Sequence, residues 1–210
     1  MTRAAVIFDL GGVVFPSPFE AFDLYDSRND LAVGTTRSII RASSETGAWA
    51  ALERGELSFT QFHAALNAEA AALGVKIDAA RVMATIGEAG GARPAMLHAI
   101  RTLRTHGFKV GALTNNWTDD RGESTPGGIG TLDLFDTIVE SAKVGLRKPD
   151  PRIYELVCCQ LQVAPTECVF LDDLGINLKP AQAMGMATIK VVDHLDALRE
   201  LSVIVNVQLH

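Results

Sequence analysis

The sequence predicts an α/β protein in which a doubly wound parallel sheet carries a helical insert. Short apolar runs typical of buried strands alternate with helical segments at the start of the chain and again from residue 94 onward. Residues 17–90 show helical patterns only. Several strand runs end in polar residues, which parallel strands would gather at one edge of the sheet. We therefore expect a core of residues 1–16 and 91–210 and a helical cap of residues 17–90.

The composition is that of an ordinary globular protein. The 210 residues are 48% hydrophobic and 21% charged, and the formal net charge is -6. This charge predicts no nucleic-acid partner, so an anionic substrate would be held by a few placed cations. No apolar stretch approaches the roughly 20 residues of a membrane span. Because Met1 almost directly precedes the first strand, we expect a free-standing cytoplasmic protein without a signal peptide or membrane contact, as a monomer or homodimer.

The first strand is the segment around which the chain is organised. An apolar run ending at Phe8 leads into Asp9, and Gly11 and Gly12 follow soon afterwards. The run is typical of a buried strand, and the glycines are typical of a tight turn. Asp9 should then lie at the carboxyl end of a central strand, where open α/β sheets bind ligands. The alternative for this motif alone is an Asp that caps the following turn.

Residues 17–90 predict a small helical bundle. The segment Phe15–Pro18 contains two prolines and leads irregularly out of the first strand. One helix begins at Ser58, a good N-cap residue, and ends before Gly74. The expected helices are Phe19–Leu31, Thr35–Ala42, Ala48–Arg54, Ser58–Leu73 and Asp78–Ile86.

From Pro94 onward, helices and strands alternate. The first of these helices has Pro94 in its first turn and Gly107 just beyond its end. A polar, glycine-rich loop is expected over Trp117–Gly130, and a helical turn over Leu132–Phe135. The expected strands are Phe108–Thr114, Thr137–Glu140, Glu167–Leu171 and Ala187–Val192. The expected helices are Pro94–His106, Pro151–Leu161, Asn177–Met184 and His194–Leu201.

A set of polar residues follows these strands or opens a helix. Its members are Asp9, Thr114, Asn115, Lys148, Asp172 and Asp173. An Asp can act as a nucleophile, and a hydroxyl with a backbone N–H can hold phosphoryl oxygens. A Lys can neutralise developing charge, and an acidic pair can bind a hard cation such as Mg²⁺. Phosphoryl transfer needs this combination of groups.

Four motifs contain these residues. They are Ile7-Phe8-Asp9-Leu10-Gly11-Gly12-Val13, Leu113-Thr114-Asn115-Asn116-Trp117, Lys148-Pro149-Asp150-Pro151-Arg152-Ile153-Tyr154 and Phe170-Leu171-Asp172-Asp173-Leu174-Gly175. In this order they resemble the haloacid dehalogenase-like hydrolase superfamily over the full length of the chain. Within it, they are similar to the amino-terminal phosphatase domain of soluble epoxide hydrolase and to the equivalent domain of acyl-CoA dehydrogenase family member ten.

The resemblance implies a Rossmann-like core with a helical cap of the C1 type inserted after the first strand. It implies that Asp9 forms an aspartyl-phosphate. It further implies that Thr114 and the backbone of Asn115 bind the phosphoryl group and that Lys148 neutralises it.

The resemblance also implies a Mg²⁺ site. The ion would bind to Asp9, to the backbone carbonyl of Gly11 and to Asp173. Two roles remain open for Asp172, which would either bind the ion through water or orient Lys148.

Gly11 departs from the pattern of the family. Phosphatases of the family usually carry an Asp two residues after the nucleophile, which protonates the leaving alkoxide and then activates the hydrolytic water. Glycine has no side chain to move a proton, and general acid–base catalysis contributes about 10²–10⁴-fold. We therefore expect a slow phosphatase, or one restricted to good leaving groups. Dehalogenases of the family usually have an aromatic residue here, so Gly11 does not favour dehalogenation.

Some charged residues near the expected site have both structural and functional interpretations. For Glu20, Asp23 and Asp26 we expect a solvated helix face rather than a proton donor that replaces the missing Asp. Asp119, Asp120 and Arg121 lie in the loop after the second strand. Arg121 would either contact a substrate anion or form a salt bridge within this loop. The run Gly127–Gly130 is interpreted as a flexible loop, because it lacks the Lys-Ser/Thr of a phosphate-binding loop.

The remaining candidates are apolar. We expect the cap aromatics Trp49, Phe59 and Phe62 to form the cap core, and either Phe15 or Phe19 to line the pocket between cap and core. The three cysteines are expected to be small buried residues in a reducing compartment; they are Cys158, Cys159 and Cys168.

The sequence thus favours a Mg²⁺-dependent hydrolase of a small or lipid-like phosphomonoester that acts through Asp9. The alternative, based on Gly11, is a catalytically weak or silent domain that binds a phosphorylated ligand or a partner protein. Carbon–halogen hydrolysis is a minor third alternative, because Lys148 and the acidic pair suit Mg²⁺ and phosphate better. The substrate itself is not encoded in any readable motif.

Overall fold

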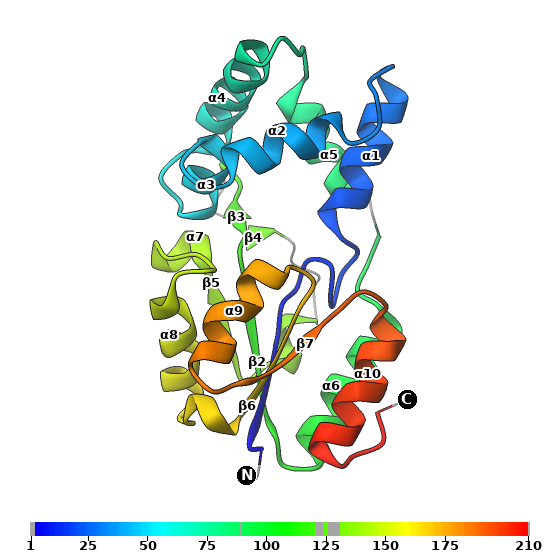
Figure 1. The fold of residues 1–210 in the computed structure, drawn as a ribbon, viewed down its shortest axis with the longest axis vertical. Coiled ribbons are helices and arrows are strands. Elements are labelled where there is room, and N and C mark those ends of the chain that lie inside the picture. The colour runs from blue at the N-terminus through cyan, green and yellow to red at the C-terminus, as the bar shows by residue number, and fades with distance from the viewer. Residues whose placement is uncertain (1–2, 89, 121–123, 126–130, 210) are drawn as a thin grey trace.

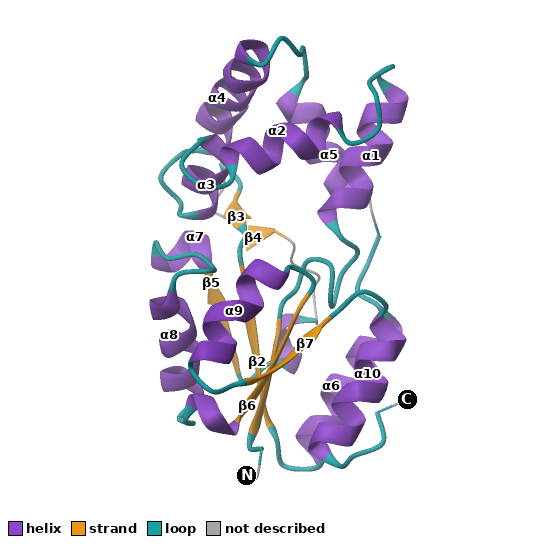
Figure 2. Cartoon of the chain, in the orientation of Figure 1, coloured by secondary structure: helices purple, strands orange, loops and turns teal. Residues whose placement is uncertain are grey.

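The protein consists of a parallel sheet with helices on both faces and a helical bundle at one end of the sheet (Figures 1 and 2). The computed structural model describes residues 3–88, 90–120, 124–125 and 131–209. The main sheet has the order β5-β2-β1-β6-β7, with all neighbours parallel. Its strands are β1 (Ala5–Phe8), β2 (Lys109–Thr114), β5 (Thr137–Glu140), β6 (Cys168–Asp172) and β7 (Ala187–Lys190). This architecture confirms the predicted fold class.

The first strand lies at the centre of the sheet, and its side chains alternate between two apolar layers. Val6 and Phe8 belong to the cluster that contains residues of α6 (Pro94–Thr105) and α10 (His194–Val205). Ala5 and Ile7 belong to the cluster formed with α8 (Pro151–Leu161) and α9 (Gly175–Ala183). A strand buried on both faces must be apolar throughout, which explains the uninterrupted apolar run in the sequence.

The described residues between β1 and α6 form five helices, which are called the cap below. They are α1 (Pro18–Arg28), α2 (Thr35–Ser43), α3 (Ala48–Glu53), α4 (Phe59–Ala72) and α5 (Ala79–Glu88). Ser58 caps α4 as expected, because its hydroxyl accepts a hydrogen bond from the Gln61 N–H while the Gln61 side chain accepts one from the Ser58 N–H. A hydrophobic cluster fills the cap and also takes in Trp117 from the core; its cap members include the buried Trp49 and Phe62 and the partly buried Phe59. The division of the chain at residues 17 and 90 stays a prediction.

One short element contradicts the interpretation of residues 117–130 as loop throughout, and another lies at residues 141–144, for which no element was predicted. Trp117–Thr118 (β3) pairs antiparallel with Ser124–Thr125 (β4), and Ser141–Val144 forms the helix α7. Both are too short to leave a periodic pattern in the sequence. Two 3₁₀ turns complete the chain, Leu132–Leu134 and Pro165–Glu167. The predicted Gly127–Gly130 loop lies outside the described residues.

The prediction for the cysteines is wrong at one position. Cys158 and Cys168 are buried, but Cys159 is exposed. Cys159 follows Cys158 on α8, so it points away from the core that its neighbour enters. Within the described ranges, no helix is both long and apolar enough to cross a membrane.

Candidate active site

The parallel register brings three of the predicted site residues to one edge of the sheet. Phe8 lies opposite Ala112 of β2 and Leu171 of β6, so Asp9 follows β1 at the level where both neighbouring strands end. The Asp9 N–H donates to the carbonyl of Leu171 at 2.9 Å. Thr114 and Asp172 are the last residues of β2 and β6. Because β1 is also where the chain reverses its direction across the sheet, this edge is the topological switch point, at which open α/β sheets bind ligands.

Lys148 joins two of these carboxylates. Its side chain is buried, and Nζ lies 2.9 Å from Asp9 Oδ2 and 2.6 Å from Asp172 Oδ2. Burial by itself lowers the pKa of Lys148, but Asp172 and Asp9 outweigh this effect and raise the pKa above its ordinary value. The lysine therefore carries a positive charge at the point where the two strands end.

The two consecutive acids have different surroundings. Asp172 is fully buried, and its carboxylate accepts hydrogen bonds from Lys148 Nζ, from the Leu174 N–H and from Asn177 Nδ2. Asp173 is partly exposed, and burial followed by repulsion from Asp172 raises its pKa to about 6. Asp172 therefore contacts Lys148 directly, and the choice between the two roles that the resemblance left open for it stays a prediction.

Three acids lie close enough together to share a cation. Carboxylate oxygens of Asp9, Asp172 and Asp173 lie within 4.8 Å of one another. Burial raises the pKa of Asp9 well above its ordinary value of 3.8, although Lys148 opposes this shift. Carboxylate oxygens are the ligands that Mg²⁺ prefers, and a divalent cation would offset the mutual repulsion of these acids.

The two glycines after Asp9 have different roles. Gly12 has a positive φ of 77°, and a Cβ at this position would lie 2.3 Å from Oδ2 of Asp173. Gly12 therefore gives Asp173 the space to approach the loop after β1. At Gly11, by contrast, a Cβ would meet only Cδ of Pro18, at an ordinary contact distance of 3.7 Å. The backbone here accepts a side chain, so packing does not require glycine at position 11.

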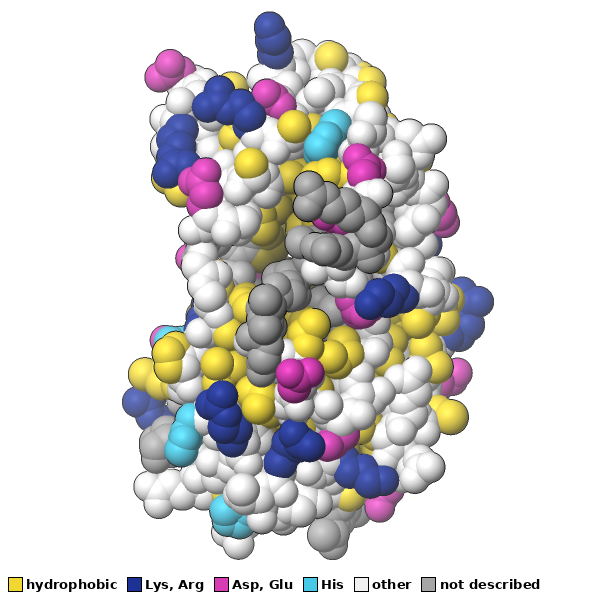
Figure 3. Space-filling model, turned by 180° about the vertical axis from the view of Figure 1, so that it is seen from behind, with side chains coloured by type: hydrophobic (Ala, Val, Ile, Leu, Met, Phe, Trp, Pro, Cys, Tyr) yellow, Lys and Arg dark blue, Asp and Glu magenta, His cyan; other side chains and the backbone are white. Residues whose placement is uncertain are grey.

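A small cavity of about 70 Å³ lies beside Gly11, between the core and the cap. Among the described residues, those that line it include no acid and no base; they are Gly11, Phe15, Pro16, Pro18, Ile86, Gly90, Thr114, Asn115 and Trp117. Hydrophobic side chains are visible where the molecule narrows between its two lobes (Figure 3). Phe15 thus lines the pocket as expected, and no lining residue replaces the carboxylate that is missing at position 11.

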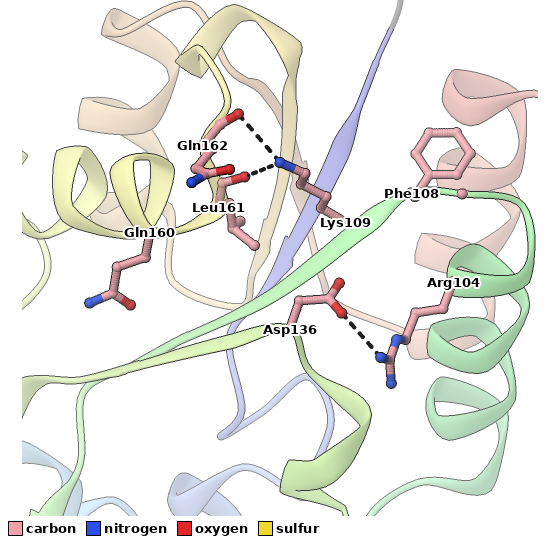
Figure 4. A pocket seen from close by; sticks show the side chains of 8 residues that line it. Arg104, Phe108, Lys109, Asp136, Gln160, Leu161 and Gln162 are labelled. Carbon is pink, nitrogen blue, oxygen red and sulfur yellow. Dashed lines mark hydrogen bonds and ion pairs between the residues drawn. The ribbon is translucent and has the colours of Figure 1, made fainter.

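A larger hollow lies at the opposite end of the sheet, around the first residue of β2 (Figure 4). Its volume is about 430 Å³. The charged groups around it are satisfied within the protein, because Lys109 Nζ donates to the carbonyl of Leu161 at 2.6 Å and Arg104 pairs with Asp136 at 3.1 Å. It lies at the amino ends of the strands, away from the switch point, so the site chemistry is assigned to the smaller cavity.

The prediction of a solvated helix face holds for some of the three acids of the first cap helix and fails for one. Glu20 is exposed, which confirms the solvated position, and Asp23 forms an ion pair with Arg37. Asp26 contradicts the prediction, because it is fully buried and accepts hydrogen bonds from the Gly34 and Thr36 backbone N–H groups at the start of α2. A helix N-terminus presents unpaired N–H groups that a carboxylate satisfies.

The loop after β2 also contacts the cap. Asp120 accepts hydrogen bonds from the Phe59 N–H at 3.0 Å and from the Thr60 hydroxyl at 2.9 Å, at the start of α4. This contact was not predicted. Arg121 lies outside the described residues.

Three further residues near the site were missed by sequence reasoning. Arg93 donates from Nη1 to the carbonyls of Gly12 and Val13, and so fixes the loop after β1. Glu53 and Arg147 form an ion pair of 2.6 Å between the cap and the core. Only Arg147, which immediately precedes Lys148, lay near a motif that drew attention to it.

Comparisons with known proteins agree with this fold. The family model described as haloacid dehalogenase-like hydrolase matches residues 4–185. The chain therefore belongs to the haloacid dehalogenase-like hydrolases, which confirms the resemblance and makes this protein a member of a hydrolase family.

Individual relatives refine the comparison. The chain is 36% identical over 98% of its length to acyl-CoA dehydrogenase family member 10 of Mus musculus, and 34% identical over its whole length to bifunctional epoxide hydrolase 2 of Sus scrofa. It spans only 19% and 40% of these two relatives. It is also 34% identical to sesquiterpene phosphatase astK of Aspergillus oryzae, with 95% of each chain covered.

A solved structure supports the fold. An enzyme of the same superfamily from Bacteroides thetaiotaomicron, in complex with magnesium and inorganic phosphate, superposes with a TM-score of 0.60 at 21% identity. The alignment covers 90% of this chain and 93% of that one.

Proposed function

We propose that the protein is a Mg²⁺-dependent phosphatase that hydrolyses a phosphomonoester through an aspartyl-phosphate on Asp9. The observation that carries this proposal is the buried Lys148, which joins the Asp9 carboxylate to Asp172 at the switch point of the sheet. A phosphoryl group bound to Asp9 would have its negative charge neutralised by this lysine. Family membership and phosphatase relatives support the same reaction class.

The proposed chemical steps use the residues at the carboxyl ends of β1 and β2. An oxygen of Asp9 attacks phosphorus, the bond from phosphorus to the ester oxygen breaks, and its electron pair leaves with the alkoxide. The Thr114 hydroxyl and the Asn115 backbone N–H, at the end of the neighbouring strand, hold the phosphoryl oxygens. Because position 11 carries no acid, the alkoxide takes its proton from water. Water then attacks phosphorus, the bond between phosphorus and the Asp9 oxygen breaks, and the Asp9 carboxylate is regenerated. The proton that this water releases neutralises the hydroxide left when the alkoxide was protonated.

The acidic cluster fits a magnesium ion. Asp9, Asp173 and the backbone carbonyl of Gly11 are the proposed ligands. Burial and repulsion from Asp172 raise the pKa of Asp173, and a bound divalent cation would oppose both effects. When bound, the ion supplies Lewis-acid stabilisation of the charge on the phosphoryl oxygens. Asp172 remains with Lys148, because its oxygens already accept several hydrogen bonds.

The cavity beside Gly11 supports a substrate with an apolar group. Its side-chain lining is largely aromatic and aliphatic, with Phe15, Ile86 and Trp117 among its members. One relative of nearly equal length is named a sesquiterpene phosphatase, after a lipid-like substrate. We therefore infer a small or lipid-like phosphomonoester as the substrate class.

A second function is a domain that binds a phosphorylated ligand without turnover. It is favoured by Gly11 and by the absence of an acid or base among the described residues of the cavity wall. Lys148 and the acidic cluster would serve such binding equally well.

The experiment that decides between the two functions is hydrolysis of 4-nitrophenyl phosphate with and without Mg²⁺, with Asp9→Asn beside the unaltered protein. Mg²⁺-dependent turnover that the variant lacks is expected for a phosphatase. Turnover that survives in Asp9→Asn would contradict the proposed nucleophile. Mg²⁺-dependent binding of inorganic phosphate without any turnover would establish the binding function instead.

A further inference from the structure

A buried carboxylate of the cap points at the catalytic segments of the core. Glu53, at the end of α3, has a side chain only 8% exposed. Within the cap it accepts a hydrogen bond from the Trp49 indole N–H at 2.9 Å. Its other oxygen, Oε2, faces the core, where Arg147 Nε and Nη2 lie at 2.7 and 2.6 Å and Asn115 Nδ2 at 3.5 Å. The carboxylate thus lies on the boundary between the two lobes.

Arg147 completes this contact from the core side. While Nε and Nη2 bind Glu53, Nη1 donates to the carbonyl of Ser44 at 2.6 Å. Ser44 is the C-cap residue of α2, where backbone carbonyls lack helical partners and a cation is favoured. The planar guanidinium therefore binds two points of the cap at once, which a lysine would not reproduce.

Asn115 connects this boundary to the lysine of the site. Its Oδ1 accepts a hydrogen bond from the Lys148 N–H at 2.8 Å, and its Nδ2 donates to the Lys148 carbonyl at 3.0 Å. This pair of hydrogen bonds fixes the backbone of Lys148, whose Nζ lies 2.9 Å from Asp9. Glu53 therefore contacts both Asn115, which holds the backbone of Lys148, and Arg147, which precedes it in the chain.

The energetics make the contact sensitive to the position of the cap. Burial raises the pKa of Glu53, and Arg147 is the main opposing influence. A buried carboxylate is stable in its charged form only while its partner is in place. Movement of the cap away from the core would separate Glu53 from Arg147 and Asn115 together.

We propose that Glu53 is a positioning residue, through which the docked cap holds Asn115 and the Arg147–Lys148 segment in the geometry needed for phosphoryl transfer. The inference rests on the proposed phosphatase function. It adds a cap residue that touches no reacting atom to the machinery of the site.

The test compares Glu53→Gln with Asp120→Asn. Asp120 is a matched control because it also joins core to cap, through the start of α4. Within the described part of the chain, its hydrogen bonds go to Phe59 and Thr60 and not to Asn115, Arg147 or Lys148. The two tryptophans of the chain report cap docking independently of turnover, since Trp49 of the cap and Trp117 of the core lie 5.7 Å apart between ring centroids. Their exciton signal in circular dichroism, called the tryptophan signal below, shows whether a variant keeps the cap docked, because it depends on the distance between the two rings. Fluorescence intensity would not separate the two effects, since the Trp49 indole N–H donates to Glu53 itself.

With 4-nitrophenyl phosphate as substrate, Glu53→Gln is expected to lower kcat about 10- to 100-fold, with a much smaller change in KM and an unchanged tryptophan signal. Asp120→Asn should keep kcat within about threefold, well below the cost of misplacing a reacting group. In the double variant Glu53→Gln with Arg147→Gln, kcat should fall no further than in the more impaired single variant, because both changes break one contact.

Unchanged kcat in Glu53→Gln would overturn the proposal, and so would an equal loss of kcat in Asp120→Asn, which would reduce Glu53 to a docking contact. Loss of the tryptophan signal in Glu53→Gln would likewise show that Glu53 only docks the cap.

If the unaltered protein shows no turnover, the phosphatase function fails but positioning is still measurable. Mg²⁺-dependent binding of inorganic phosphate, measured by calorimetry, should then weaken about tenfold in Glu53→Gln and not in Asp120→Asn. Equal phosphate binding by the unaltered protein, Glu53→Gln and Asp120→Asn would overturn the proposal that Glu53 positions the site. The absence of phosphate binding by the unaltered protein would also overturn it.

Discussion

Replacing Gly11 with Asp should turn a slow phosphatase into a faster one. The backbone at this position does not need glycine, because a Cβ would meet only Pro18 Cδ at 3.7 Å. The position also borders the cavity between core and cap, so a carboxylate there would face a bound leaving group. The neighbouring acids, Asp9 among them, would raise the pKa of the new carboxyl group and favour the protonated form that a general acid requires.

The size of the gain follows from the role of the proton. General acid–base catalysis contributes about 10²–10⁴-fold, which corresponds to about 2.7–5.4 kcal/mol of barrier at 1.36 kcal/mol for each factor of ten. An alkyl phosphate has a poor leaving group and should gain most of this factor. An aryl phosphate expels a stabilised phenolate and should gain much less. The measurement is kcat/KM for a series of phosphomonoesters that differ in the pKa of the leaving alcohol.

Gly11→Asn is the matched control, since it has nearly the same size and cannot donate a carboxyl proton. An equal gain in Gly11→Asn and Gly11→Asp would refute proton transfer as the cause. A folded Gly11→Asp protein that binds Mg²⁺ and gains no activity on any substrate of the series would also refute the reasoning, because steric room and proximity would then be insufficient.

Three other changes test separate parts of the site and the cap. Gly12→Ala should weaken Mg²⁺ binding, measured by calorimetry, and lower the free energy of unfolding by about 1–3 kcal/mol. The reason is that the new Cβ would lie 2.3 Å from Asp173 Oδ2 on a backbone with a positive φ. An unchanged Mg²⁺ affinity would contradict the close approach of Asp173 to Gly12. Asp172→Asn should lower the free energy of unfolding in urea by about 3–5 kcal/mol, because it breaks a buried pair with Lys148, whereas the partly exposed Asp173 should tolerate Asn with little loss. Burial lowers the pKa of His63 below 6.5, so the unfolded state binds more protons and stability should decrease as the pH falls below that value. The melting temperature should therefore fall less on acidification in His63→Gln, and an identical pH profile would contradict this account.

The sequence predicted the elements that local chemistry controls. The apolar run before Asp9, the N-cap at Ser58 and the proline at the start of α6 each depend on residues within one turn or one strand. The convergence of Asp9, Thr114 and Asp172 was also predictable, because parallel strands end at a common edge whatever their separation in the chain. The pairing of β3 with β4 escaped prediction, because two-residue strands carry no periodic signal.

The sequence by itself thus determined the fold class, the family and the set of polar residues at the strand ends. Only the tertiary structure decided that Asp172 binds Lys148 while Asp173 packs against Gly12. It also decided that Glu53 meets Arg147, a residue 94 positions away. The physical reason is that periodicity and caps depend on neighbours in the chain, whereas the environment of a buried charge depends on side chains that packing brings from distant segments.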